Sequence, residues 1–412
     1  MESRRNFLRK GEILIGSFIA GSAPGSYQKH KTSNNILEFG AKGDGSDDTL
    51  AFKKAIELIN KGELSSLYIP SGTYKIDTDI CIIRNKCKIY GDGSTSILQP
   101  IDIKYAKRNA NSTAINIQSN SCIIEDINIQ HFYTAIKWNT KQQININRCH
   151  ISYNTIGIMT IDGYINSISN NYICFNKIGI VSLGKSFQLL IQSNVIDNNI
   201  SQEIGGIGIL LMGSNGCEIR YNTIEGNRNL TNGIGCGIFA VGICSKLNII
   251  GNWFEVNYEL GKQDVSLSSD IYFFNKDYVN INAHKKIVSC LILEELMKHL
   301  NQSSYGSLNI RDNVFIYTPT NILLTNFNFG RVSITGNTFT GNEAFSNKSI
   351  YVTHKENAYY NTTVYIHDNC IQNISGNSNI VNKRMLSGLN GSLLFLDNTT
   401  KINGSLNIKN ED

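Results

Sequence analysis

The sequence has little of several features that define large classes of protein. Only 4 of its 412 residues are proline, which excludes long proline-rich linkers. Charged residues make up 17% and the formal net charge is +5, without long basic runs. Nucleic-acid binding is therefore not indicated, although an acidic polymer would not be repelled. Beyond the N-terminus, no segment reaches the roughly 18 uninterrupted apolar residues that a membrane span requires, so we expect none.

Common catalytic and metal-binding motifs are also missing. The seven histidines are dispersed, and neither H-x-x-x-H nor H-E-x-x-H occurs, so a zinc site is not expected. No G-x-S-x-G nucleophile elbow is present. The ten cysteines are scattered and form no C-x-x-C pair. This pattern favours the interpretation that the cysteines are small hydrophobic residues buried in the core. Disulfides stay open as an alternative if the protein is exported.

The N-terminus is similar to a twin-arginine export signal. Arg4 and Arg5 lie in a Ser-Arg-Arg-x-Phe-Leu core, which a short apolar stretch and small residues follow. Ala20 and Ser22 suit the small-residue positions of a cleavage site. The resemblance predicts a signal peptide over residues 1–22 and a periplasmic or secreted protein.

One short phrase recurs along most of the chain: an apolar residue, two further residues, an asparagine, one residue and another apolar residue. The fourth position of the phrase is held in turn by Cys149, Asn171, Asn194, Asn222, Asn252, Asn313, Asn337 and Asn369. A second column, five residues later, contains Asn154, Asn176, Asn199, Asn227, Asn257, Thr318, Asn342 and Ile374. We expect each asparagine to adopt the left-handed conformation of a sharp turn and to bond to the next along the axis.

The short period of this repeat indicates the fold. A unit of about 22 residues has room only for short strands and tight turns, because a helix of ten or more residues would not fit. Short apolar segments lie between the phrases, many of them opening with Gly-Ile. The pattern predicts an all-β protein, a single-stranded right-handed parallel β-helix over residues 101–400.

Additions to the repeat mark places where a binding site could be built. The wide gap between Asn252 and Asn313 predicts an insertion at about 258–309, in which residues 287–300 have helical spacing. Residues 201–206 and 225–233 lengthen loops on neighbouring coils. Loops that extend from a rigid scaffold commonly carry function.

An aspartate-rich stretch, FGAKGDGSDDTLAFKKAI, stands at residues 39–56. It reads as a glycine-rich turn and an amphipathic helix, which Asp47 or Asp48 could cap. Leu50, Ala51, Ala55, Leu58 and Ile59 would share the buried face of the helix. The spacing of an EF-hand calcium loop is not met, so we expect these aspartates to shape the backbone.

The order of motifs over residues 36–100 resembles the N-terminal module of the pectate-lyase-like β-helix superfamily. The matching motifs are Phe-Gly-Ala at 39–41, Gly-Asp-Gly at 43–45, Asp-Asp at 47–48, Ile-Pro-Ser-Gly-Thr-Tyr at 69–74 and Gly-Asp-Gly at 91–93. That superfamily includes rhamnogalacturonase-like enzymes, epimerase-like proteins and phage tailspikes. The resemblance implies a module with an N-terminal capping helix and a polysaccharide as partner. The whole chain is similar to twin-arginine-exported bacterial β-helix repeat proteins.

The resemblance implies no particular mechanism. The Asn-Thr-Asp, Asp-Asp, Gly-His-Gly and Arg-Ile-Lys signatures of polygalacturonase-like enzymes do not occur in the repeats, and the Asp-Pro-His motif of alginate epimerases is missing. Candidate residues must therefore come from the register of the repeat itself.

Three successive coils carry a carboxylate at one outward position, three residues after the recurring asparagine: Asp197, Glu225 and Glu255. Neighbours in such a column would lie about 5 Å apart and the outer pair about 10 Å apart. These separations bracket the two carboxylate geometries of glycoside cleavage, which makes the three residues candidate catalytic groups. Alternatively, the column could hold Ca²⁺ that neutralises a uronate, or it could be a solvated face paired with Lys and Arg.

Aromatic and basic residues near this column are candidates for substrate binding. His150, Tyr172 and Trp253 lie two positions before the column residues of their coils, and the tyrosine and tryptophan could stack on sugar rings. Arg220 and Arg228 could pair with acidic sugars.

Two kinds of function follow. One is an exported polysaccharide lyase or glycoside hydrolase that acts on an extended polymer, with uronic acids as one option. The other is a non-catalytic β-helix that binds glycan or builds the cell envelope. No cofactor is certain, and Ca²⁺ is the one candidate. The oligomeric state stays open.

Overall fold

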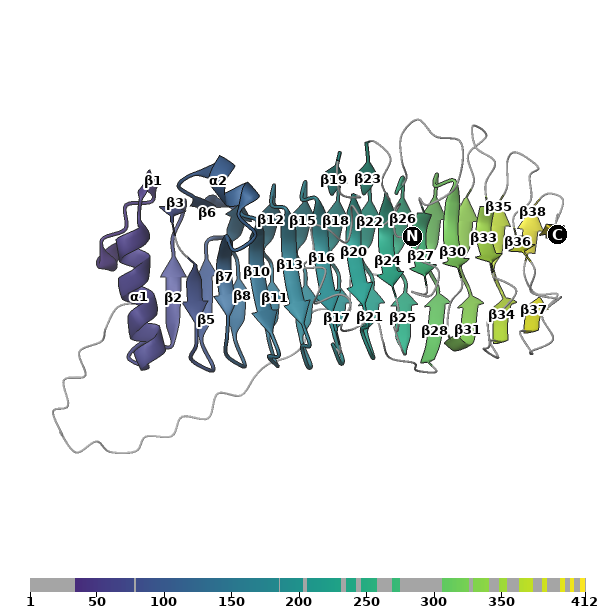
Figure 1. Ribbon diagram of the computed structural model, residues 1–412, viewed down its shortest axis with the longest axis horizontal. Coiled ribbons are helices and arrows are strands. Elements are labelled where there is room, and N and C mark those ends of the chain that lie inside the picture. The colour runs from purple at the N-terminus through teal and green to yellow at the C-terminus, as the bar shows by residue number, and fades with distance from the viewer. Residues whose placement is uncertain are drawn as a thin grey trace, which may run out of the picture. The chain divides into compact units, whose positions relative to one another are not determined.

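The computed structural model describes residues 34–77, 79–184, 186–202, 206–230, 235–241, 246–257, 269–274, 306–325, 329–340, 348–353, 363–372, 380–383, 393–396, 401–403 and 408–411. Most of these residues belong to three long parallel sheets, which we name sheet A, sheet B and sheet C. Figure 1 shows the strands stacked in sequence order away from helix α1 (Thr49–Lys61).

Sheet A has 12 strands: β2 Ser66–Ile69, β5 Lys88–Gly91, β8 Ile123–Glu125, β11 Asn145–Asn147, β14 Ser167–Ser169, β17 Leu190–Gln192, β21 Glu218–Arg220, β25 Leu247–Ile250, β28 Gly306–Arg311, β31 Phe329–Thr335, β34 Thr363–His367 and β37 Leu393–Leu396.

Sheet B has 13 strands: β1 Asp44–Asp47, β3 Gly72–Ile76, β6 Ser96–Pro100, β9 Asn128–Gln130, β12 His150–Ser152, β15 Tyr172–Cys174, β18 Val195–Asp197, β22 Thr223–Glu225, β26 Trp253–Glu255, β29 Val314–Ile316, β32 Thr338–Thr340, β35 Cys370–Gln372 and β38 Lys401–Asn403.

Sheet C has 12 strands: β4 Ile80–Ile82, β7 Thr113–Ile117, β10 Thr134–Asn139, β13 Ile156–Ile161, β16 Ile178–Leu183, β20 Ile207–Met212, β24 Cys236–Val241, β27 Ser269–Phe274, β30 Thr320–Thr325, β33 Lys348–Thr353, β36 Ile380–Lys383 and β39 Ile408–Glu411.

The remaining described elements are short. They are the 3-10 helices η1 Ile36–Phe39 and η2 Gly93–Thr95, the helix α2 Ile103–Arg108 and the strand pair β19 Ile200–Ser201 and β23 Arg228–Asn229. Within the described part of the chain, neither α-helix has the length and apolar character to cross a membrane.

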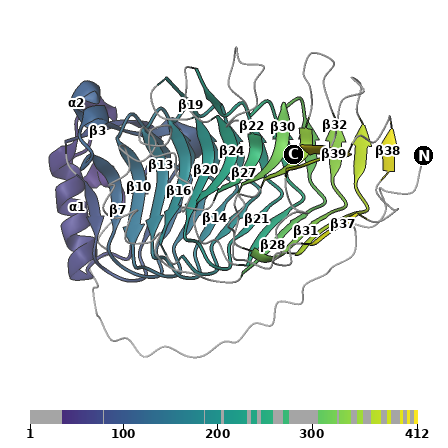
Figure 2. The same ribbon diagram turned by 45° about the vertical axis from the view of Figure 1, so that its right-hand side comes forward.

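Each coil of the chain passes once through each sheet. For example, β11, β12 and β13 contribute to sheets A, B and C, and each pairs in parallel with the equivalent strand of the next coil, β14, β15 and β16. Figure 2 shows the coils side by side after a turn of the view. This topology is that of a parallel β-helix, so the predicted all-β fold is confirmed.

The interior is filled by ladders of apolar side chains. In β18, β22 and β26 of sheet B, the middle residue points inward, and Ile196, Ile224 and Phe254 are fully buried on consecutive coils. Further along, the rings of Phe315 and Phe339 stack with centroids 4.8 Å apart. Burial of one such side chain stabilises the fold by about 1.5–3 kcal/mol, so each coil depends on its neighbours for stability.

The predicted asparagine ladder is present at the corner between sheets A and B. The backbone N–H and side-chain Nδ2 of Asn171 both donate to Asn194 Oδ1, at 2.9 and 3.0 Å. Asn194 makes the same two bonds to Asn222, and the pattern continues to Asn369. These side chains are buried, and each hydrogen bond contributes about 1 kcal/mol, so the ladder holds the coils in register.

The expectation that these asparagines are themselves left-handed is wrong. The residue before each one has the positive φ instead: Asn170 (57°) precedes Asn171, and Ser193 (55°) precedes Asn194. At Tyr221 and Asp312 even bulky or charged residues take this conformation. A left-handed residue costs about 1–2 kcal/mol unless it is glycine. The asparagines offset this cost by satisfying the backbone groups of the turn.

The aspartate side chains of residues 39–56 accept hydrogen bonds from backbone N–H groups, as their expected role in shaping the backbone requires. The Asp48 carboxylate accepts from the backbone N–H groups of Lys42 and Gly43, at 2.7 and 3.1 Å, and makes no side-chain cap to α1. Asp47 Oδ1 accepts from Thr49 N at 2.9 Å. In contrast to our prediction, Leu50 is 73% exposed, because the buried face of α1 is centred on Phe52 and Ile56.

The range predicted as an insertion, about 258–309, contains β27, a regular strand of sheet C. Strand β27 pairs with β24 and β30 in sheet C, and Asn252 donates directly to Asn313 Oδ1 at 3.0 Å. The two asparagines are thus on adjacent coils. The predicted signal peptide at 1–22 and the predicted helix at 287–300 lie outside the described residues.

Candidate functional site

The three predicted carboxylates stand in one column on the outer face of sheet B. Asp197 pairs with Glu225, and Glu225 pairs with Glu255, in the registers of β18, β22 and β26. Their neighbours Ile196 and Ile224 point into the core, so the carboxylates point to the opposite face. Adjacent strands lie about 4.8 Å apart, which brings like charges together along the column.

Asp197 is the most enclosed of the three carboxylates, with 8% of its surface exposed. Its Oδ2 atom accepts a hydrogen bond of 3.3 Å from the Tyr172 hydroxyl. Its Oδ1 atom is buried and accepts no hydrogen bond from the described residues. A buried acceptor without a donor is costly, so Asp197 stands out among the described carboxylates.

Gly226 keeps the space beside Asp197 open. This residue has φ +62°, and a Cβ atom here would lie 3.2 Å from Asp197 Oδ1 and 2.8 Å from Asn198 Oδ1. A larger residue would therefore be strained in its backbone and would crowd the unsatisfied oxygen.

Glu225, in the middle of the column, is set up to hold a proton. Burial raises the pKa of its carboxyl, and the charges of Asp197 and Glu255 raise it further. A carboxylic acid that keeps its proton to higher pH can act as a general acid. Glu255 differs, since its Oε2 atom accepts a hydrogen bond of 3.0 Å from the indole N–H of Trp253.

Aromatic side chains lie beside the column, as predicted. His150 and Tyr172 are paired in the registers of β12 and β15, and their rings meet edge to face at 5.1 Å. Tyr172 is 38% exposed and Trp253 is 41% exposed. Both rings are therefore accessible next to carboxylates, to which each donates a hydrogen bond.

Cys174 joins this cluster, although it was not among the predicted site residues. It precedes Asp197 in the same column and its Sγ lies 3.5 Å from His150 Nε2. Burial and the Asp197 charge raise the pKa of the thiol to about 12, and burial lowers the pKa of His150. Both groups are thus neutral near pH 7, which does not suit a thiolate nucleophile. Its position three residues after Asn171, equivalent to that of Asp197, is the feature of the sequence that could have identified it.

The two predicted arginines lie in different places. Arg228, in β23, donates to Gly226 O at 3.3 Å and to Asn198 Oδ1 at 3.1 Å, so it borders the column. Arg220 lies in sheet A, where it bonds to Gln192 and pairs with Glu218 at 2.7 Å. The structure therefore brings Arg228, but not Arg220, to the sheet B carboxylates.

Three aromatic rings lie at the corner between sheets B and C, on coils that precede the coil of Asp197. His131, Tyr153 and Phe175 stack on three consecutive coils, with centroids 5.4 and 5.2 Å apart. Tyr153 and Phe175 are 44% and 42% exposed and have positive φ. They were not predicted, although each directly follows a column residue in the sequence.

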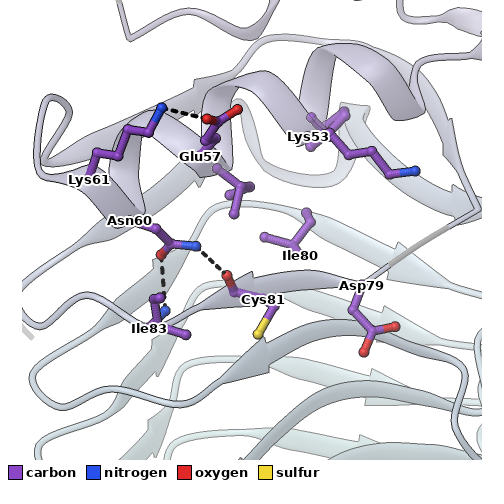
Figure 3. Close-up of a pocket in the computed structure, with 10 residues that line it drawn as sticks. Lys53, Glu57, Asn60, Lys61, Asp79, Ile80, Cys81 and Ile83 are labelled. Carbon is purple, nitrogen blue, oxygen red and sulfur yellow. Dashed lines mark hydrogen bonds and ion pairs between the residues drawn. The ribbon is translucent and has the colours of Figure 1, made fainter.

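A separate cavity of about 440 Å³ lies between α1 and β4. Figure 3 shows Asn60 reaching from α1 to the free edge of β4, where it donates to Cys81 O and accepts from Ile83 N, both at 3.0 Å. Glu57 and Lys61 form an ion pair at its rim. Because Asn60 satisfies the edge strand, we assign this cavity to the cap of the β-helix.

The fold and its outward carboxylate column define a parallel β-helix with a candidate carbohydrate-active face. Residues 33–235 match the family model described as rhamnogalacturonase A/epimerase, pectate lyase-like. No curated protein sequence matches the chain.

Solved structures resemble the fold over most of the chain. The catalytic unit of a GH87 α-1,3-glucanase from Streptomyces thermodiastaticus has 14% identity and a TM-score of 0.54, with 94% of this chain and 70% of that chain covered. The Dettilon tailspike protein has 15% identity and a TM-score of 0.62, covering 87% and 68%. PfbA, a surface adhesin of Streptococcus pneumoniae, has 12% identity and a TM-score of 0.57, covering 88% and 89%. At these identities the likeness extends to the fold.

Proposed function

We propose that the protein is a glycoside hydrolase that binds an extended polysaccharide along the outer face of sheet B. The observation that carries this proposal is the column of Asp197, Glu225 and Glu255 on adjacent coils, with a raised pKa at Glu225. Glu225 acts as the general acid, Glu255 as the second carboxylate, and Asp197 holds the proton on Glu225 by its negative charge.

The spacing of the column favours one stereochemical course. Glu225 and Glu255 are on neighbouring strands, about 4.8 Å apart, which suits a nucleophile and an acid in a retaining enzyme. Asp197 and Glu255 are two strands apart, a distance that suits the inverting arrangement. We expect retention, because Glu225 is the carboxyl whose pKa is raised and Glu255 is its direct neighbour.

The charge of the face bears on the choice between hydrolysis and elimination. A lyase must neutralise the carboxylate of a uronate, whereas the negative charge of Asp197 and Glu255 repels it. Arg228 borders the column, yet its guanidinium is engaged with Gly226 and Asn198. A neutral polymer therefore fits better, as a glucan does for the Streptomyces glucanase of similar fold. A uronate polymer would need a cation such as Ca²⁺ on the column.

A non-catalytic role is the second candidate. It is favoured by the missing polygalacturonase signatures and by the low exposure of Asp197, which restricts direct contact with a substrate. In this case the column and its aromatic neighbours would bind glycan without cleaving it, on a fold that a surface adhesin also uses.

One experiment separates these functions. Purified protein is incubated with neutral glucans and with uronic-acid polymers, with Ca²⁺ and with a chelator. New reducing ends from a neutral glucan support the hydrolase, and nuclear magnetic resonance of the first product gives the stereochemistry. Unsaturated-uronate absorbance would instead establish a lyase. If neither product forms while a polymer-containing affinity gel retards the protein, the binding role replaces the enzyme.

The twin-arginine signal and the export of the protein also stay proposals. Their test is the mature N-terminus of the protein recovered from a bacterial periplasm, with Arg4→Lys and Arg5→Lys together as the blocking variant. Retention of the wild type in the cytoplasm would overturn them.

A further inference from the structure

Two cysteines are stacked at the corner where the chain passes from sheet C to sheet A. Cys87 directly precedes β5 and Cys122 directly precedes β8. Because Lys88 pairs with Ile123, the two cysteines hold the same position on consecutive coils. Their Sγ atoms are 3.4 Å apart, and both side chains are buried.

The backbone around the two cysteines repeats from one coil to the next. The residues before them, Lys86 and Ser121, have nearly equal positive φ angles of 61° and 57°. Lys86 N donates to Asn120 O, and Ile123 N donates to Cys87 O, both at 3.0 Å. Strands about 4.8 Å apart place equivalent Cα atoms within the range of about 4.4–6.8 Å that a disulfide spans.

Other buried cysteines have different surroundings. The Sγ of Cys149 faces the carbonyl oxygens of Ile124 and Asn147, at 3.6 and 3.4 Å. The Sγ of Cys236 faces Ile238 O at 3.0 Å. These thiols behave as small core residues, as the sequence predicted, but Cys87 and Cys122 each have a sulfur atom as neighbour.

We propose that Cys87 and Cys122 are an oxidation site that forms a disulfide between the coils of β5 and β8. With glutathione disulfide as the oxidant, one cysteine loses its proton and attacks a glutathione sulfur, which releases one reduced glutathione. The second cysteine then loses its proton and attacks the mixed disulfide, which releases another. The protein loses two electrons and two protons, and the glutathione disulfide takes up both electrons.

The position of the bridge explains what it would do. Coils near the end of a solenoid open more readily than central coils. The bridge joins the coil of β5, the second strand of sheet A, to the coil of β8, the third strand, across 35 residues of chain. A covalent link here restricts the unfolding of the N-terminal module, whatever the function of sheet B.

Peptide mapping tests the proposal. The full-length protein is refolded with a mixture of oxidised and reduced glutathione, blocked with an alkylating reagent after denaturation, and digested without reductant. We expect a cross-linked peptide that contains Cys87 and Cys122 and that disappears on reduction. The variant Cys87→Ser should lose it, whereas Cys149→Ser should keep it. The oxidised wild type should also resist proteolysis within residues 34–100 several-fold longer than its reduced form.

The opposite result is equally clear. If Cys87 and Cys122 are both recovered as alkylated peptides after oxidative refolding, with the protein folded by circular dichroism, the bridge does not form. Cross-links of either cysteine to a different partner would also overturn the proposal, and the wild type alone supplies both readouts if a variant fails to fold.

Discussion

Carboxylates in two regions of this molecule have opposite surroundings. In the cap, Asp44 accepts from Ser46 N and Asp47 accepts from Thr49 N, and these hydrogen bonds lower the pKa of both carboxyls. On sheet B, none of the described residues donates to Asp197 Oδ1, and burial together with like charge raises the pKa of Glu225. The comparison teaches that hydrogen-bond donors at an exposed carboxyl lower its pKa, whereas burial near like charges raises it.

Asp270 combines full burial with full pairing, and its pH dependence gives the largest expected effect on stability. Asn257 and Thr318 donate to its Oδ1 atom and Asn321 donates to Oδ2, yet burial raises its pKa from 3.8 to about 7. A carboxyl with a raised folded pKa stabilises the protein fully below its unfolded pKa and loses this contribution as the pH rises. The contribution lost between about pH 4 and pH 7 is on the order of 4 kcal/mol.

The measurement is chemical unfolding of the wild type and Asp270→Asn at pH 4.5 and pH 8. We expect the wild type to lose more stability than the variant on going to pH 8. Asp312→Asn, at an exposed ion pair, is the control that should follow the wild type. Equal pH dependence in wild type and Asp270→Asn would show that Asp270 is charged in the fold at both pH values.

Loss of a carboxylate that accepts backbone hydrogen bonds is the next largest effect. Asp48→Ala removes the acceptor of Lys42 N and Gly43 N at a position that is 3% exposed, so we expect a loss of about 3 kcal/mol. Leu50→Ala, at an exposed position of the same helix, should cost less than about 0.5 kcal/mol. Urea unfolding checks both, and a stable Asp48→Ala would mean that the cap does not depend on this carboxylate.

Asp197→Asn should have the smallest effect on stability, and its sign should be reversed. Because none of the described residues donates to Oδ1 and Glu225 is a neighbouring acidic group, removal of the charge should leave stability unchanged or raise it by about 1 kcal/mol. The same change should lower the pKa of Glu225. The alkaline limb of the pH–rate profile, where the acid is lost, should then move to lower pH. A limb that stays in place would separate Asp197 from the reacting pair.

The sequence predicted the fold well because the repeat is enforced by geometry at every coil. The register of Asp197, Glu225 and Glu255 followed directly from the asparagine spacing, and it holds in the structure. Their catalytic role stays a prediction. Arg220 lies at the end of β21, before the corner that leads from sheet A to sheet B. The pattern of apolar and polar residues around it does not show on which sheet it lies.

Other features were hidden because they depend on contacts between coils. Tyr153 and Phe175 have a left-handed backbone conformation at the corner, where their side chains are exposed. Aromatic residues disfavour this conformation, so their residue types do not predict the position. The proximity of Cys87 to Cys122 required the pairing of β5 with β8, across a coil that the recurring asparagine phrase does not cover.

The most direct test of the central claim is the specific activity of Glu225→Gln, measured as new reducing ends on a polymer that the wild type cleaves. Glu218→Gln is the matched control, because Glu218 lies on sheet A in an ion pair with Arg220. We predict that kcat/KM falls by about 10²–10⁴-fold in Glu225→Gln, with affinity for the polymer kept, and changes little in Glu218→Gln. Unchanged activity in Glu225→Gln would contradict the assignment of the sheet B carboxylates as the catalytic site.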